Sequence, residues 1–302
     1  MPSRRRYLTA VSAVLIGLAG CTSGPGGTVT TTETEPTDTE PKKSPSGTPT
    51  EPPEAAKRSV GGDTVAVTDI VVKKAVTYQS TMGSGGVVAV EGKQFVVASV
   101  QSDAELSMDA FSLRAAGDEW VAGTLEDTGA TNYAVEGHEG GPLGKPIGGD
   151  GPNYVVFEIP SPLDVAESVI HLDHNGESAE WALGDDAVTT LAAPEPSFEL
   201  DSLSAPDSVR QGDQMDVSLT VSNSSDTDGR FLAAVYWPTE LIADDDESHI
   251  VETAIDTGAT TTQSLSIDTE YTTNEDGPIT LRVGGHVSAE TEVVVEDAST
   301  PD

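Results

Sequence analysis

The residues best suited to chemistry are two histidines and two acids near the middle of the chain. His171-Leu172-Asp173-His174, followed by Glu177, offers side chains that can bind metal ions. The run has the alternation of a β-strand, however, and strand residues three apart point to opposite sides of the sheet. We therefore interpret these residues as polar side chains that enter a turn at Asn175-Gly176, and we predict no metal site here.

A second candidate for metal binding is the acidic run Asp244-Asp245-Asp246-Glu247. Calcium is a hard cation that prefers carboxylate oxygens. The run lacks the ligand spacing of an EF-hand loop, and acidic residues are frequent along the whole chain. Whether residues 244–247 bind a cation stays open at this stage.

The sequence offers no pattern of an enzyme. The segment "GGPLGKPIGGDGPN" contains Gly-Lys, but Pro146 stands where a P-loop needs Ser or Thr, so we interpret it as a flexible connection. A blue-copper site needs a cysteine ligand, and the one cysteine is Cys21. No nucleophile elbow is present. We predict no catalytic residue, no cofactor and a non-enzymatic function.

One modification signal lies in the second half of the chain. Asn223-Ser224-Ser225 is an N-glycosylation sequon, and it follows an alternating run at the start of a polar turn. We predict that Asn223 can carry an N-linked glycan.

The first twenty residues indicate export. Ser3-Arg4-Arg5-Arg6-Tyr7-Leu8 resembles the twin-arginine motif, whose arginine pair (here Arg4 and Arg5) is recognised by an export receptor. The uncharged stretch at 8–20 is shorter than the about 20 apolar residues that a spanning helix needs. A charged head followed by a short apolar body is typical of a signal peptide.

The end of this signal resembles a lipobox. In Leu18-Ala19-Gly20-Cys21 the resemblance implies cleavage before Cys21 and attachment of a lipid to its thiol. We therefore predict a twin-arginine lipoprotein signal peptide at 1–20 and a membrane anchor at Cys21. With a single cysteine, the chain can form no internal disulfide.

Residues 21–59 differ in composition from the rest. Thr, Pro, Glu, Ser and Gly dominate after Cys21, without apolar periodicity, so the segment cannot build a core. We predict a lipidated, disordered linker that acts as a stalk.

The charge balance excludes one class of partner. The chain has 51 acidic and 15 basic residues, a net charge of −36. Nucleic-acid binding needs clustered Lys and Arg, so we predict none. High net charge also favours disorder, but the apolar alternating runs favour folded domains with an acidic surface. This combination resembles proteins of extreme halophiles, in which concentrated salt screens the repulsion.

The chain from 60 to 193 has the pattern of a β-sandwich. Short alternating runs separated by turn residues are typical of that fold, and "KQFVVASVQS" has the density of a central strand. Phe111-Ser112-Leu113 and Val156-Phe157-Glu158-Ile159-Pro160 resemble a telokin-like, immunoglobulin-type extracellular domain of unknown function that is common in lipoproteins. The resemblance implies a sandwich and no reaction.

A second domain follows a proline-rich hinge at Pro194 and Pro196. "QMDVSLTVSN" alternates, which places Met215, Val217 and two further apolar residues on the inner face. "PDSVRQGDQMDVSLTVSNSSDTDGRF" resembles the beginning of the cell-adhesion-related domain of bacteria and archaea (CARDB), which implies an immunoglobulin-like sandwich at 197–297.

The sequence thus predicts an all-β protein of two immunoglobulin-like sandwiches on a stalk. We expect a non-enzymatic binding or structural module on the extracellular face of the membrane of a halophile. It would be held there by the lipid and would contact a surface protein or a glycan. The alternative is an accessory or sensory subunit that captures a solute or a partner for a membrane complex.

Overall fold

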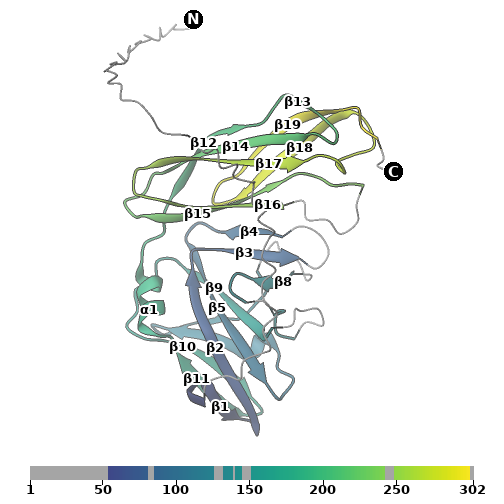
Figure 1. Ribbon diagram of the computed structural model, residues 1–302. Helices are drawn as coiled ribbons and strands as arrows, with labels where there is room; N and C mark the ends of the chain where they lie inside the picture. The colour runs from purple at the N-terminus through teal and green to yellow at the C-terminus, as the bar shows by residue number, and fades with distance from the viewer. Residues whose placement is uncertain are drawn as a thin grey trace, which may run out of the picture. The chain divides into compact units, whose positions relative to one another are not determined.

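The computed structural model describes residues 54–80, 85–125, 132–138, 140–144, 151–241 and 248–299. The predicted signal peptide and nearly all of the predicted stalk lie outside these ranges. The described residues confirm the all-β prediction: they form two β-sandwiches with few helical turns (Figure 1). None of the described helices is long and apolar enough to cross a membrane.

The first sandwich contains the strands β1 to β11 and three short helical elements. In chain order these are η1 (Glu54–Ala56), β1 (Lys57–Val60), β2 (Asp63–Lys73), β3 (Ala75–Ser80), β4 (Gly86–Ala89), β5 (Lys93–Ser102), η2 (Met108–Ala110), β6 (Phe111–Ala115), β7 (Asp118–Val121), β8 (Asn132–Val135), β9 (Asn153–Pro160), β10 (Ser168–His174), β11 (Glu177–Ala182) and α1 (Asp185–Ala192).

Three sheets, rather than two, make up this first domain. The sheet β1-β2-β5-β9 packs against β11-β10-β6-β7, and the small sheet β4-β3-β8 covers its other face. In β9, Val155, Phe157 and Ile159 enter the main core, while Tyr154 and Val156 enter the second one. The unbroken run of buried residues from Gln94 to Val100 in β5 is explained by this arrangement, because the central sheet is buried on both faces.

The folded part begins earlier than the predicted boundary at residue 60. Residues 57–60 form β1, which pairs with β2, and the indole N–H of Trp181 donates to the carbonyl oxygen of Ala56 at 2.6 Å. The predicted linker at 21–59 is therefore too long at its C-terminal end. Sequence alternation missed β1 because the strand has only four residues and three are polar or charged.

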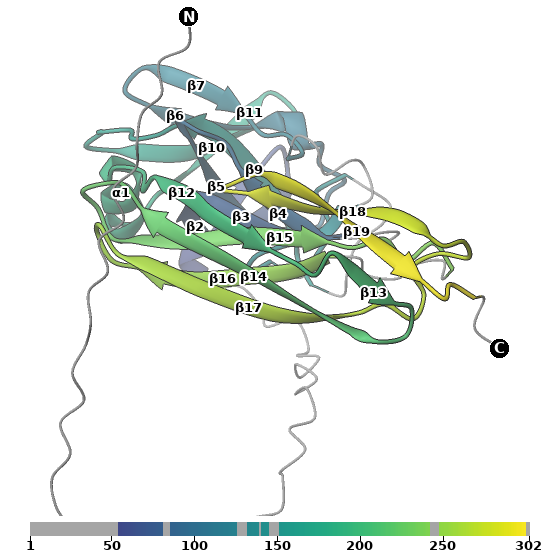
Figure 2. The same cartoon turned by 90° about the horizontal axis from the view of Figure 1, so that it is seen from above.

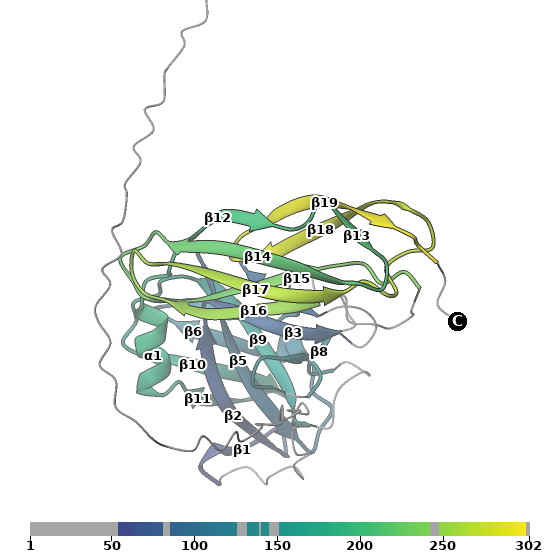
Figure 3. The ribbon, with the colours of Figure 1, turned by 45° about the horizontal axis from the view of Figure 1, so that its top comes forward.

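The second sandwich has a three-stranded and a five-stranded sheet (Figure 3). Its strands are β12 (Phe198–Ser204), β13 (Ser208–Arg210), β14 (Gln214–Asn223), β15 (Gly229–Tyr236), β16 (Ser248–Ile255), β17 (Thr260–Asp268), β18 (Gly277–Gly285) and β19 (Ala289–Glu296). The sheet orders are β12-β14-β17 and β13-β19-β18-β15-β16, and β13 runs parallel to β19. Met215, Val217, Leu219 and Val221 are buried, as the alternation predicted.

Packing on both faces of the central sheet of the first domain should contribute to the free energy of unfolding. Phe157 on β9 and Phe95 on β5 are fully buried, in the main and the second core respectively. Because truncation leaves a cavity, we expect Phe157→Ala and Phe95→Ala each to lower the free energy of unfolding by about 3–5 kcal/mol in denaturant titrations. Val121→Ala, at a side chain 59% exposed, is the control and should cost less than about 0.5 kcal/mol. A cost for Phe95→Ala as small as that control would contradict a three-sheet domain.

Candidate functional site

The two sandwiches meet along a seam formed by β4 of the first domain and by β15 and β18 of the second. Two glycines at this seam have no room for a Cβ. A Cβ at Gly86 would collide with the hydroxyl of Tyr236, and one at Gly285 would lie 3.1 Å from Val87 Cγ1 and 2.7 Å from the carbonyl oxygen of Leu232. The seam is therefore a packed contact between the domains.

A tyrosine pair closes this contact. The hydroxyl of Tyr236 is hydrogen-bonded to Tyr78 and to the backbone of Val87, and the Arg282 guanidinium carbon lies 4.8 Å from the Tyr236 ring centroid. Burial, together with the neighbouring Tyr78 hydroxyl, raises the pKa of Tyr236 to about 12. The phenol consequently stays neutral at physiological pH and acts as a hydrogen-bonding group.

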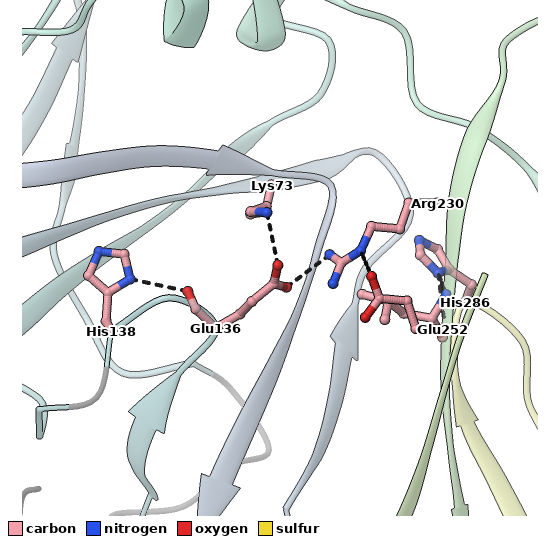
Figure 4. A network of polar contacts seen from close by, with 7 residues as sticks. Lys73, Glu136, His138, Arg230, Glu252 and His286 are labelled. Carbon is pink, nitrogen blue, oxygen red and sulfur yellow. Dashed lines mark hydrogen bonds and ion pairs between the residues drawn. The ribbon is translucent and has the colours of Figure 1, made fainter. Parts of the chain in front are cut away.

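A chain of four charges crosses the seam (Figure 4). Glu136 Oε1 accepts from Lys73 Nζ at 2.8 Å, and Glu136 Oε2 accepts from an Arg230 terminal nitrogen at 2.9 Å. Arg230 Nε in turn donates to Glu252 Oε1 at 2.6 Å. We call these four residues the seam network; its first two members come from the first sandwich and the other two from the second.

Two members of the seam network, Arg230 and Glu252, stabilise each other in their charged forms. The hydrogen bond with Glu252 raises the pKa of Arg230, and the same bond lowers the pKa of Glu252. Cations are scarce in this chain, with 15 against 51 acids, yet Lys73, Arg230 and Arg282 each contact a residue of the seam. Scarce positive charge is thus placed where two acidic domains meet.

Two histidines lie near the seam network (Figure 4), and one of them, His138, bonds to the backbone of its member Glu136. His138 Nδ1 lies 3.2 Å from the carbonyl oxygen of Glu136, and its Nε2 lies 2.9 Å from the carbonyl oxygen of Asp69. Asp69 has a positive φ of 50° within the irregular part of β2, between Thr68 and Val71. This bulge presents the carbonyl group that fixes His138.

His286, on the second sandwich, is held in its neutral form. Its Nδ1 accepts from the backbone N–H of Leu232 at 2.9 Å, and its ring contacts Phe198 edge-on with centroids 4.9 Å apart. Among the described atoms, its Nε2 is buried without a hydrogen-bond partner. Burial lowers the pKa of His286 to about 4.

The predicted hinge is tied to the first sandwich. Lys74 Nζ donates to the carbonyl oxygen of Ala193 at 2.8 Å, and also to Gln94 Oε1 at 2.8 Å and Ser161 Oγ at 3.0 Å. Burial lowers the pKa of Lys74, while the carboxylate of Glu195 opposes that shift. A lysine with three acceptors anchors the start of the connector, so this segment is bound at its first residue.

A cleft of about 480 Å³ opens where this connector passes the seam. Glu195 Oε2 accepts from the backbone N–H of Gly92 at 3.0 Å, and burial raises the pKa of Glu195. The cleft is lined by Ala89, Val90, Glu91, Gly92, Glu195, Pro196, Ser197, Phe198, Gly285 and His286. Two carboxyl groups and an aromatic ring would suit a small ligand with a positive charge and an apolar part.

The structure separates the residues considered for a metal site. His171 Nδ1 lies 3.8 Å from Asp173, whereas His174 Nε2 lies 3.0 Å from Asp63 in the first hairpin. Glu177 accepts from the backbone N–H of Gly61 at 2.8 Å. The histidines therefore have different partners, and residues 175–176 form the expected turn between β10 and β11. Among the described residues, no three or more of His, Cys, Asp and Glu are grouped to hold a metal ion.

Asn223 has a structural role in the folded chain. Its side chain is 1% exposed, and its Nδ2 donates to the carbonyl oxygens of Thr227 at 2.7 Å and Ile255 at 3.0 Å. Its Oδ1 accepts from the backbone N–H and the hydroxyl of Ser225. Every hydrogen-bonding position of the amide is used. The folded domain does not present this nitrogen to a glycosyltransferase, so the prediction of a glycan at Asn223 survives only for a chain modified before folding.

Other predicted residues lie outside the described ranges. These are the lipidation residue Cys21, the export residues Arg4 and Arg5, and the acidic run Asp244 to Glu247. The predictions made for them remain predictions.

Sequence reasoning missed the seam network entirely. Lys73, Glu136, Arg230 and Glu252 lie far apart in the chain and match no motif. A usable signal was the scarcity of cations, because each Lys or Arg in so acidic a chain has many possible partners. Which partner it takes depends on the packing of the two domains.

Comparison with known proteins adds no identity. No protein-family profile and no curated protein matches the chain. A β-glucosidase from Listeria innocua aligns with 35% of this chain and 17% of its own length, at 20% identity and a TM-score of 0.30. A β-glucosidase from Erythrobacter marinus aligns with 33% of this chain and 16% of its own length, at 18% identity and a TM-score of 0.29. A DUF4785 family protein from Legionella pneumophila covers 77% of this chain and 57% of its own, at 12% identity and a TM-score of 0.20. Likenesses this weak carry no argument about function.

The charge contact across the seam should be energetically coupled. In a double-mutant cycle with Arg230→Met and Glu136→Gln, we expect a coupling energy of about 0.5–3 kcal/mol from denaturant titrations, because both side chains are at least two-thirds buried. The control pair is Arg210 and Asp297, which are 2.8 Å apart but each 65% exposed. Its coupling should be about 0–1 kcal/mol. Equal coupling in the two cycles would mean that Arg230 contributes no more than a surface ion pair.

Acid should destabilise the protein through His286. Its pKa in the folded state, about 4, lies below the ordinary value of 6.5, so the unfolded chain binds the proton more tightly. The contribution is complete above pH 6.5 and is lost as the pH falls towards 4. We expect the free energy of unfolding of the native chain to fall more steeply over this window than that of His286→Phe, in urea titrations at matched salt. Above pH 6.5 the two should differ by a constant. Parallel profiles throughout would contradict a buried neutral imidazole.

Proposed function

We propose that this chain is a lipid-anchored, non-enzymatic binding or structural module on the surface of a halophile. The observation that supports this most directly is the seam. The ion pair between Glu136 and Arg230 joins the two sandwiches directly, and Lys73 and Glu252 bond to its two members, so this network serves to fix one sandwich on the other. A head of two joined sandwiches suits the presentation of an outer surface to a partner.

Location rests on the N-terminal sequence. The resemblance to a twin-arginine signal and a lipobox supports export through Arg4 and Arg5 and attachment of a lipid to Cys21. The segment that follows, rich in Thr, Pro and Glu, supports a stalk between the membrane and the head. The acidic surface supports life in concentrated salt and a partner other than nucleic acid, either a surface protein or a glycan.

One observation favours the second candidate function, an accessory or sensory subunit that captures a solute. The cleft beside the seam brings Glu91, Glu195 and Phe198 together in a space of about 480 Å³. Cross-linking in intact envelopes at high salt distinguishes the two functions. Enrichment of a membrane-complex component favours the accessory role, and enrichment of surface-layer protein or glycan favours the structural one.

Removal of the proposed lipid should release the chain. An acyl chain contributes about 0.8 kcal/mol per buried methylene, and the described residues contain no membrane-spanning helix. We therefore expect Cys21→Ser to move the protein from the membrane pellet to the soluble or precursor fraction in cell fractionation, detected by immunoblot. Arg4→Lys with Arg5→Lys is the companion variant and should leave unprocessed precursor inside the cell, because the receptor distinguishes guanidinium groups from amines. Firm membrane association of a processed Cys21→Ser chain would refute the anchor.

A further inference from the structure

The strand β17 ends its sheet with an open edge. On one side it pairs with β14 along its whole length, from Gln214↔Asp268 to Ser222↔Thr260. No other described strand pairs with its second side, and Figure 2 shows β17 at the outer margin beside β14. An unpaired edge of a regular strand offers a row of backbone donors and acceptors to another strand.

This edge lacks the features that usually prevent strand pairing between molecules. From Thr260 to Ile267 there is neither a charged residue nor a proline, although the chain carries 51 acids. The opposite margin of the same sheet, β12, differs: it has an irregular pairing between Leu200 and Ser202 and carries Glu199 and Asp201. Bulges and charges of this kind protect sheet edges. The β12 edge of the sheet is therefore protected against pairing with another strand, whereas the β17 edge is not.

The strand β17 is also held in an extended conformation of fixed register, which suits pairing with another strand. Ile267 is buried and Leu265 partly buried in the core of the second sandwich, which fixes the register of β17. The alternate residues Thr260, Thr262, Ser264 and Ser266 are exposed. Thr262 Oγ1 lies 2.9 Å from Thr220 Oγ1 on β14, so hydroxyl groups continue across the outer face of the sheet. An incoming strand would meet an extended backbone and a face of small neutral side chains.

We infer that β17 is an association edge for a second copy of this chain, which pairs through its own β17 in the antiparallel direction. Two chains of net charge −36 repel each other, so they can approach only where both surfaces lack charge. Antiparallel self-pairing with Ser264 opposite Ser264 places Asp268 opposite Thr260 of the second copy, so no like charges face each other. Such a two-fold contact is isologous and closes at the dimer.

Concentrated salt favours this contact. The screening length falls from about 10 Å at 0.1 M salt to about 3 Å at 1 M, so repulsion between the rest of the two acidic surfaces fades while backbone pairing persists. The dimer should therefore strengthen as salt rises. The inference goes beyond the proposed function, because it depends on neither the lipid nor the export route.

The test is sedimentation velocity of the full-length chain over a range of concentrations, at about 0.2 M and about 2 M potassium chloride. We expect a monomer–dimer equilibrium that shifts to dimer at the higher salt. Ser264→Asp puts two carboxylates at the two-fold axis and should abolish the dimer. Ser202→Asp, on an exposed residue of β12, is the matched control and should leave the dimer intact. Circular dichroism melts confirm that each variant is folded.

A mixing experiment makes the geometry specific. Ser264→Asp and Ser264→Lys should each be monomeric alone, because like charges meet at the axis, and an equimolar mixture should recover the dimer. A monomer at every concentration and salt would overturn the inference. So would loss of the dimer in Ser202→Asp with retention in Ser264→Asp, or a mixture that stays monomeric while the unaltered chain dimerises.

Discussion

The arrangement of the two sandwiches depends on one carboxylate that is shared between them. Glu136 follows β8 and receives Lys73 on one oxygen and Arg230 on the other. In a chain with 51 acids, a contact between two domains must overcome mutual repulsion before apolar packing can stabilise it. Two cations around one carboxylate give that place a local positive excess, which Glu252 then neutralises from the second sandwich. The packing of Tyr236 against Gly86 and of Val87 against Gly285 becomes electrostatically tolerable because of this balance.

The sequence predicted those parts of the fold that depend on local periodicity. The faces of β9 and β14 follow from alternation within each strand, since a period of two decides which side chains point inward. The third sheet of the first domain was not predictable in this way. Its strand β3 pairs with β4 nearby but also with β8, more than fifty residues later, and such partners are chosen by the assembled core. The dense apolar run of β5 held the information that both faces are covered, but not which strands cover them.

The candidate sites show the same contrast between features set by local strand geometry and features set by the assembled fold. The opposite orientation of His171 and His174 followed from strand geometry alone and is seen in their separate partners. Asn223 shows the limit of a motif. A sequon specifies three consecutive residues, whereas accessibility depends on Thr227 and Ile255, whose carbonyl groups close over the amide. An amide with four hydrogen bonds at the end of a buried strand stabilises the junction of three segments, and that role competes directly with modification.

An acidic surface of this kind also limits where the molecule can be recognised. Because acids far outnumber cations in this chain, an anionic partner or a second copy is repelled by most of its surface. Two places differ. At the seam, the scarce cations form ion pairs that join the domains, so they do not bind an outside ligand. Between Thr260 and Ile267 of β17 there is no charged residue, and attraction must come from backbone pairing and hydroxyl groups. The seam is a fixed contact within one chain, because it buries ion pairs. Pairing along β17 is a reversible contact between chains, because it needs salt to let two like-charged bodies approach.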